Sequence, residues 1–190
     1  VLLKGAAYEV AGLPVARGRI SSDVDLLLEK DDLAAAEQAL LTHGWRHVKL
    51  EPYDQLYYRQ WTHELPQLQH GERETFVDVH HGILPVTSRL KPDVTRLLAL
   101  ATPLGGEYAR WKVLSPEHMV LHSAVHGFHD GELDNPLADI LDIHQLVSGF
   151  LQRETRFMDR LYEEARTLGL LRPLRYALRA SQRYFGTALP

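Results

Sequence analysis

Two aspartates, Asp23 and Asp25, stand one residue apart in RISSDVDLLLEK (residues 19–30), a segment that otherwise reads as a buried strand. Successive side chains of a β-strand point to opposite faces, so both carboxylates project from the same side. The apolar residues between and after them are expected to face a core on the other side. Two like charges this close repel each other unless a cation neutralises them. The spacing therefore indicates a metal ion as one neutralising partner.

A third carboxylate, Asp78, lies in a second strand-like segment, TFVDVHHGIL. If the two strands are neighbours, Asp23, Asp25 and Asp78 converge on one edge of a sheet. The sequence offers these carboxylates no obvious basic partner. A hard, oxygen-rich site of this kind suits Mg²⁺, or Mn²⁺ in its place. His80 shares the face of Asp78 and is a candidate for contact with a substrate.

The composition restricts the classes of function. The formal net charge of the 190-residue chain is −4, which does not favour electrostatic binding to nucleic acid or to an anionic membrane over a large surface. There are no cysteines, which excludes disulfides, thiolate zinc sites and thiol nucleophiles. No apolar run approaches the roughly 18–20 residues of a membrane span. With no recognisable signal peptide either, we expect a cytoplasmic protein without membrane segments.

Strand-like and helix-like pieces alternate in the first part of the chain. VLLKG is expected to end a strand, with Gly5 allowing a tight turn into a short helix. The segments 45–50 and 55–61 are predicted to form a strand hairpin, with its aromatic side chains in the core. Helices are predicted after Ser115 and after Asn135, because each of these capping residues precedes a proline.

Two further amphipathic helices are expected at 154–168 and 173–185. The predicted fold is α+β: a small mixed β-sheet core with flanking helices, followed by a C-terminal helical bundle. We expect two units, residues 1–90 for the α/β core and residues 91–190 for the helical domain.

Several motifs occur in an order that resembles a known family. They are LLKGAAYEVAGLPVARGRISSDVDLLLEKDDLAAAEQALLTHGW, then FVDVHHGI, then LSPEHMVLHSAVHGFHD with LADILDIHQLV. Together they resemble the uncharacterised bacterial nucleotidyltransferase family of the polymerase-β superfamily. The resemblance covers most of residues 2–148 and implies a nucleotidyltransferase core in the first unit.

The resemblance implies nucleotidyl transfer by two metal ions. Asp23 and Asp25 would hold Mg²⁺ ions on the triphosphate of a nucleoside triphosphate, which we expect to be ATP. Asp78 would join them and help to deprotonate an acceptor hydroxyl, which attacks the α-phosphorus while pyrophosphate leaves. Lys4 and Arg19 would meet phosphate charge. From the residues alone, Arg19 is also a candidate for an ion pair with Asp23, and Lys4 for contact with solvent or with a carboxylate.

The turn that would face the phosphates departs from the wider superfamily. Many members have Gly-Ser at this point, whereas Gly5 is followed here by Ala6. The phosphate cradle would then depend on backbone groups, which donate well at a helix start, and on Lys4. Because the charge balance is acidic, a small molecule or a protein is favoured over nucleic acid as the acceptor.

A row of histidines leaves other functions open. The row is His118, His122, His126 and His129, spaced by four, four and three residues. His122 and His126 are candidates for facing the substrate. With Asp139 and Asp142 on the following helix, they are also candidates for a metal site in a metal-dependent phosphohydrolase, although the HExxH pattern of a Zn²⁺ site is absent. A catalytically silent binding module, such as one half of a toxin–antitoxin pair, is the other alternative. The oligomeric state is open.

Overall fold

The computed structural model describes residues 1–18, 23–49, 51–128 and 135–189. Its main sheet has four strands in the spatial order β1 (Asp23–Leu27), β4 (Phe76–His80), β3 (Leu68–His70) and β2 (Trp45–His47). β1 and β4 are parallel and the other pairs are antiparallel, so the sheet is mixed, as predicted. In the parallel pair, Asp25 lies directly beside Asp78.

The first residues of the chain extend this sheet past β1. Leu2 bridges to Leu26 of β1 on one side and to Val113 on the other. The backbone N–H of Leu3 donates to the carbonyl of Asp25 at 2.9 Å. Val113 belongs to a two-stranded ribbon of β5 (Thr102–Pro103) and β6 (Lys112–Val113). The start of the first helix is therefore fixed next to β1.

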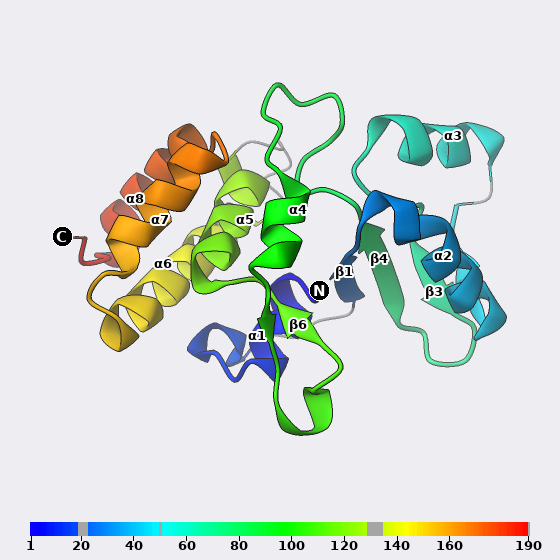
Figure 1. The fold of residues 1–190 in the computed structure, drawn as a ribbon, viewed down its shortest axis with the longest axis horizontal. Coiled ribbons are helices and arrows are strands. Elements are labelled where there is room, and N and C mark those ends of the chain that lie inside the picture. Colours follow the sequence, from blue (N-terminus) through cyan, green and yellow to red (C-terminus); the bar gives the residue numbers. More distant parts are fainter. Residues whose placement is uncertain (19–22, 50, 129–134, 190) are drawn as a thin grey trace.

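Helices make up most of the remaining structure. The α-helices are α1 (Lys4–Val10), α2 (Leu33–Thr42), α3 (Pro52–Trp61), α4 (Val94–Ala99), α5 (Pro116–Phe128), α6 (Pro136–Arg153), α7 (Phe157–Thr167) and α8 (Leu171–Phe185). Short 3₁₀ turns are η1 (Pro14–Ala16), η2 (Lys30–Asp32) and η3 (Gly106–Tyr108). Figure 1 shows α5 to α8 as a bundle on one side, with the main sheet, α2 and α3 on the other.

The predicted caps of the bundle helices are present. Ser115 Oγ accepts a hydrogen bond from the N–H of His118 at 3.3 Å at the start of α5. Asn135 Oδ1 accepts one from the N–H of Ala138 at 3.4 Å at the start of α6. Each side chain satisfies a backbone donor that the helix itself leaves unpaired, which is why these two boundaries could be predicted from sequence.

Buried apolar residues form two clusters. The larger cluster fills the bundle and also includes Leu3 and Leu27. The smaller one contains Leu68 and Val77 and packs against α2. Both faces of β1 therefore contact apolar side chains, and Leu27 shares the face of Asp25. The division into units 1–90 and 91–190 stays a prediction.

The predicted hairpin is wrong in its second half. Residues 55–61 belong to α3 rather than to a strand, and β3 takes the place of the expected partner of β2. The aromatic side chains of α3 are not in the core: Tyr53, Tyr57 and Trp61 are 75%, 45% and 52% exposed. These residues are four apart, so they form a row along one solvent-facing side of the helix.

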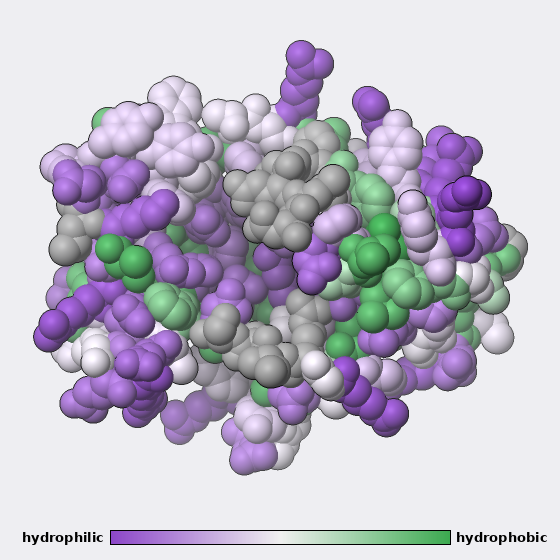
Figure 2. Space-filling view, turned by 180° about the vertical axis from the view of Figure 1, so that it is seen from behind, coloured by the Kyte–Doolittle hydropathy of each residue, from purple (hydrophilic) through white to green (hydrophobic). Residues whose placement is uncertain are grey.

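The outer surface is polar over most of the face seen in Figure 2, and hydrophobic side chains gather mainly over the helical bundle. Within the described part of the chain, no helix has the length and apolar character that a membrane crossing requires.

Candidate active site

Three carboxylates meet on the face of β1 and β4 that is turned toward the bundle. One oxygen each from Asp23, Asp25 and Asp78 lies within 4.8 Å of the other two. The predicted convergence is confirmed, because the parallel register places the two strands' aspartates side by side. A set of oxygen donors only is what Mg²⁺ prefers in proteins, so these residues fit the ion that the family implies.

Asp25 is the most buried of the three, at 8% exposed. His80 Nε2 donates to Asp25 Oδ1 at 3.2 Å. Burial raises the pKa of Asp25, but the hydrogen bond from His80 and the nearby charge of Lys4 outweigh it and lower the pKa to about 2. The expectation that the carboxylates have no basic partner is therefore wrong for Asp25. Its partner, His80, lies on β4 and is 55 residues away in the sequence, so the pairing could not be inferred from neighbouring residues.

The pKa of Asp78 is shifted in the opposite direction from that of Asp25. Gln67 Nε2 donates to Asp78 Oδ2 at 3.1 Å, which favours the ionised form. Burial nevertheless raises the pKa of Asp78, and the adjacent charge of Asp25 raises it further. Two neighbouring carboxylates whose pKa values move apart are suited to different tasks: Asp25 stays ionised while Asp78 takes up a proton more readily.

The turn before α1 differs from the prediction in one respect. The backbone conformation with positive φ falls on Lys4, at 42°, whereas Gly5 and Ala6 already lie in the first turn of α1. Positive φ is uncommon for a residue with a side chain and often marks a functional position. Lys4 also lowers the pKa values of Asp25, His63 and His122, so its charge belongs to this site. Arg19, the other predicted phosphate contact, lies outside the described residues.

The histidine row of α5 divides between two environments. His118 is 1% exposed and its Nε2 contacts Glu164 of α7 at 2.9 Å. His122 is 5% exposed and lies near Lys4, His80 and Asp25, whose charges act on its pKa. His126 is half-buried next to His122.

Within the part of the chain that the structure describes, the row does not form a group of metal ligands, and the phosphohydrolase alternative stays untested. Among the described residues, the groups of three or more possible metal ligands contain neither His122 nor His126. His129 lies outside the described residues. A role for His80, His122 or His126 in facing a substrate stays a prediction.

Three side chains around the carboxylates were missed by the sequence analysis. Gln67 donates a hydrogen bond to Asp78. One possible ligand atom each of His63, Glu64 and His80 lies within 4.8 Å of the other two. The mistaken hairpin placed residues 62–67 after a strand rather than beside β4. The adjacent His-Glu pair before the β4 strand is the signal that could have drawn attention to them.

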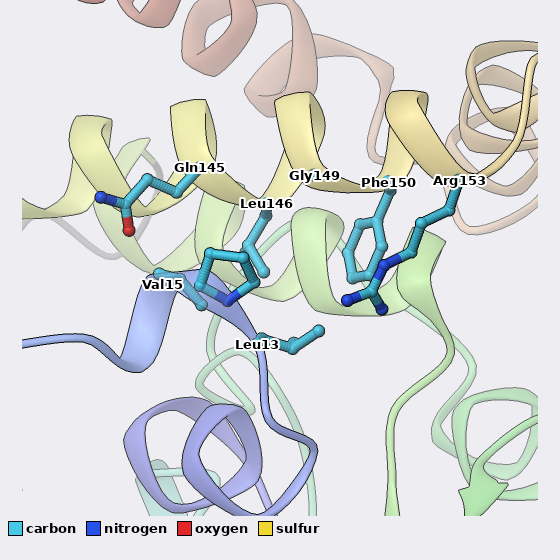
Figure 3. A pocket seen from close by; sticks show the side chains of 8 residues that line it. Leu13, Val15, Gln145, Leu146, Gly149, Phe150 and Arg153 are labelled. Atoms are coloured by element: carbon cyan, nitrogen blue, oxygen red, sulfur yellow. The ribbon is translucent and has the colours of Figure 1, made fainter.

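A small hollow between η1 and α6 is separate from the carboxylate cluster. It has a volume of about 10 Å³ and is lined by side chains that include Leu13, Val15, Leu146 and Phe150, as Figure 3 shows. None of the candidate residues lines it. A hollow of this size holds about one water molecule, so it does not compete with the carboxylates as a nucleotide site.

Comparisons with known proteins agree with this geometry. The fold is similar to that of the antibiotic-resistance factor ANT(2'')-Ia, solved in solution, with a TM-score of 0.52, 12% identity, and coverage of 96% of this chain and 86% of that one. At this identity the likeness concerns the fold alone. No curated protein matches the sequence. A family model described as "uncharacterised nucleotidyltransferase" matches residues 1–186. With its carboxylates on neighbouring parallel strands and this match over nearly its whole length, the chain belongs to the uncharacterised nucleotidyltransferase family.

Proposed function

We propose that the protein transfers a nucleoside monophosphate from ATP to a hydroxyl group of an acceptor, with two Mg²⁺ ions held by Asp23, Asp25 and Asp78. The observation that carries this proposal is the approach of these three carboxylates to within 4.8 Å on adjacent strands. Bound there, Mg²⁺ ions, or Mn²⁺ ions in their place, would stabilise the charge on the attacking and leaving oxygens together.

The two central aspartates have separate tasks in this reaction. Asp25 is ionised at neutral pH, since its pKa lies at about 2. Asp78 is the general base: Gln67 holds its Oδ2, and Oδ1 accepts the proton of the acceptor hydroxyl. The hydroxyl oxygen then bonds to the α-phosphorus, and the bond to pyrophosphate breaks.

The positive charge for the phosphates comes from the start of α1. Lys4 stands beside the carboxylates, and its ammonium group can meet phosphate oxygens as a point charge. Gly5 and Ala6 follow it in the first helical turn and present backbone N–H groups without a bulky side chain. Arg19 is the second proposed phosphate contact.

The acceptor enters from the side of the bundle. His126 is the α5 histidine with more access to solvent, because it is half-buried whereas His122 is 5% exposed. A small molecule or a protein is favoured as acceptor over nucleic acid because the net charge is −4. We expect the reaction to take place in the cytoplasm, where ATP is supplied.

Calorimetric titration with Mg-ATP tests this function on the wild type, on Asp78→Asn and on Asp32→Asn. Asp32 is an exposed aspartate at the start of α2 and is the matched control. We expect the wild type and Asp32→Asn to bind alike and Asp78→Asn to bind at least about 10-fold more weakly, a loss of about 1.4 kcal/mol. Incubation with α-labelled ATP then reports label transferred to candidate acceptors.

Two results would overturn the proposal. One is a wild-type protein that binds none of the four nucleoside triphosphates with Mg²⁺, which would leave the silent binding module. The other is equal binding by Asp78→Asn and the wild type, which would place the nucleotide away from the carboxylates.

A further inference from the structure

A second cluster of possible metal ligands lies next to the carboxylates and has a different chemistry. One ring nitrogen each from His63 and His80 and one oxygen from Glu64 lie within 4.8 Å of one another. The backbone fixes both sides of this cluster. Glu64 forms a β-bridge with His80, and the N–H of His81 donates to the carbonyl of His63 at 2.8 Å. The three ligands are thus presented by paired backbone rather than by a free loop.

The two nitrogens of His80 have unequal surroundings. Nε2 donates to the carboxylate of Asp25, so Nδ1 is left as the nitrogen with a lone pair. Nδ1 is buried and has no hydrogen-bond partner, in a residue that is 5% exposed. It lies 3.3 Å from Glu64 Oε2, outside hydrogen-bond geometry. A lone pair and a carboxylate oxygen this close repel each other unless a cation lies between them or one of the two groups carries a proton. Zn²⁺ or a similar ion is the cation that would satisfy both groups at once.

The spacing of these atoms suits a transition metal. Bonds of about 2.0–2.1 Å to nitrogen and oxygen in tetrahedral geometry place neighbouring ligand atoms about 3.3 Å apart. The separation between His80 Nδ1 and Glu64 Oε2 is 3.3 Å. His63 supplies the second imidazole: its ring centre lies 5.3 Å from that of His80, and its Nδ1 is buried without a partner.

We propose that His63, Glu64 and His80 form a binding site for Zn²⁺ or a similar transition-metal ion, separate from the Mg²⁺ site of the three aspartates. Two imidazoles and one carboxylate are a donor set for Zn²⁺, whereas oxygen donors alone favour Mg²⁺. Three protein ligands leave a fourth position for water or for a group of a substrate.

Asp25 connects the two sites. A metal-bound histidine usually donates its other N–H to a carboxylate, which fixes the orientation of the ring. Asp25 Oδ1 accepts this bond from His80 at 3.2 Å. An ion on Nδ1 of His80 would therefore hold the Nε2 proton on the side of Asp25 and keep this carboxylate in place.

Titration with Co²⁺ tests the site directly, because tetrahedral Co²⁺ absorbs visible light strongly and Zn²⁺ competes for the same ligands. The protein should carry no histidine tag and should first be treated with a chelator. The variants are His63→Asn, Glu64→Gln and Asp78→Asn. His47→Asn is the matched control, since His47 contacts Glu37 at 2.7 Å and belongs to neither group of possible metal ligands. Circular dichroism confirms that each variant is folded.

We expect the wild type to bind one equivalent of Co²⁺ with a tetrahedral spectrum that Zn²⁺ abolishes. His63→Asn and Glu64→Gln should bind at least about 100-fold more weakly, because even an outer-shell partner is worth about 10–100-fold in affinity. His47→Asn and Asp78→Asn should bind like the wild type. A folded wild type that binds no Co²⁺ or Zn²⁺ overturns the proposal, as does binding that Asp78→Asn abolishes and His63→Asn leaves unchanged.

Discussion

His80 on β4 donates from Nε2 to Asp25 Oδ1 on β1 at 3.2 Å, although 55 residues separate the two in the sequence. The bond is buried, since His80 and Asp25 are 5% and 8% exposed. Hydrogen bonds to an ionised carboxylate in such a place favour the charged form strongly. One imidazole therefore maintains the charge of a carboxylate in the proposed active site.

Replacing His80 should raise the pKa of Asp25. In His80→Leu the burial that raises this pKa remains, and the hydrogen bond that lowers it is lost. We expect the pKa to rise clearly above about 2, although the charge of Lys4 still lowers it in this variant. The shift of the Asp25 carboxyl carbon in an NMR titration measures it.

His80→Gln is the matched control, because its side-chain amide can still donate to Asp25. This variant should keep the pKa of Asp25 lower than His80→Leu does. Equal pKa values in the wild type and both variants would show that His80 does not control the ionisation of Asp25.

A second prediction concerns Glu164, which ties three helices together. Its carboxylate accepts from Arg96 Nη2 on α4 at 2.6 Å and from His118 Nε2 on α5 at 2.9 Å. These bonds outweigh burial and lower the pKa of Glu164 to about 2. Because the His118 side chain is fully buried, weakening this acceptor should lower the free energy of unfolding by about 1–3 kcal/mol in Glu164→Gln.

Urea unfolding of the wild type, Glu164→Gln and Glu163→Gln measures this effect. Glu163 is the adjacent, exposed glutamate on α7, and its variant should stay within about 0.5 kcal/mol of the wild type. If the two variants are equally stable, the link between α5 and α7 contributes nothing measurable.

The parts of the fold that local rules determine could be predicted from the sequence. Alternation along a strand has a period of two, so it placed Asp23 and Asp25 on one face. The capping signals at Ser115 and Asn135 depend on the residue and its next neighbours only, and both caps are present. The convergence with Asp78 required one further assumption, that the two strands are neighbours, which the parallel pairing confirms.

The errors arose where burial or distant pairing decides the outcome. Tyr53, Tyr57 and Trp61 are strand-favouring residues, but their spacing by four residues and the proline at the start of α3 are helical signals. The contacts of Asp25 with His80, and of Asp78 with Gln67, depend on which distant segments pair with each other, which the pattern within one segment does not specify. The cluster of His63 and Glu64 with His80 has the same origin.

A third prediction concerns pH. Burial lowers the pKa of His122 well below its ordinary value of 6.5, and the nearby positive charge of Lys4 lowers it further. The unfolded chain takes up a proton on this histidine below about pH 6.5, whereas the folded protein does not. The free energy of unfolding should therefore fall as the pH decreases through this range.

Urea unfolding at about pH 7.5 and about pH 5 measures the change, and His122→Gln should lose less stability between the two than the wild type does. The quantity compared is the change in the free energy of unfolding between the two pH values. A destabilisation that the substitution causes equally at both pH values does not affect it. His43→Gln, which changes an exposed histidine after α2, should keep the wild-type pH dependence. A wild-type pH dependence in His122→Gln would contradict the prediction.

A fourth prediction contrasts the aromatic row of α3 with the core beneath the sheet. Tyr53 is 75% exposed, whereas Leu68 of β3 is fully buried between Val77 and α2. Leu68→Ala leaves a cavity and should lower the free energy of unfolding by about 2–5 kcal/mol. Tyr53→Ala removes a side chain that faces water and should change it by less than about 0.5 kcal/mol. Urea unfolding followed by circular dichroism compares the two, and a Tyr53→Ala variant as unstable as Leu68→Ala would mean that these aromatic side chains are buried in solution.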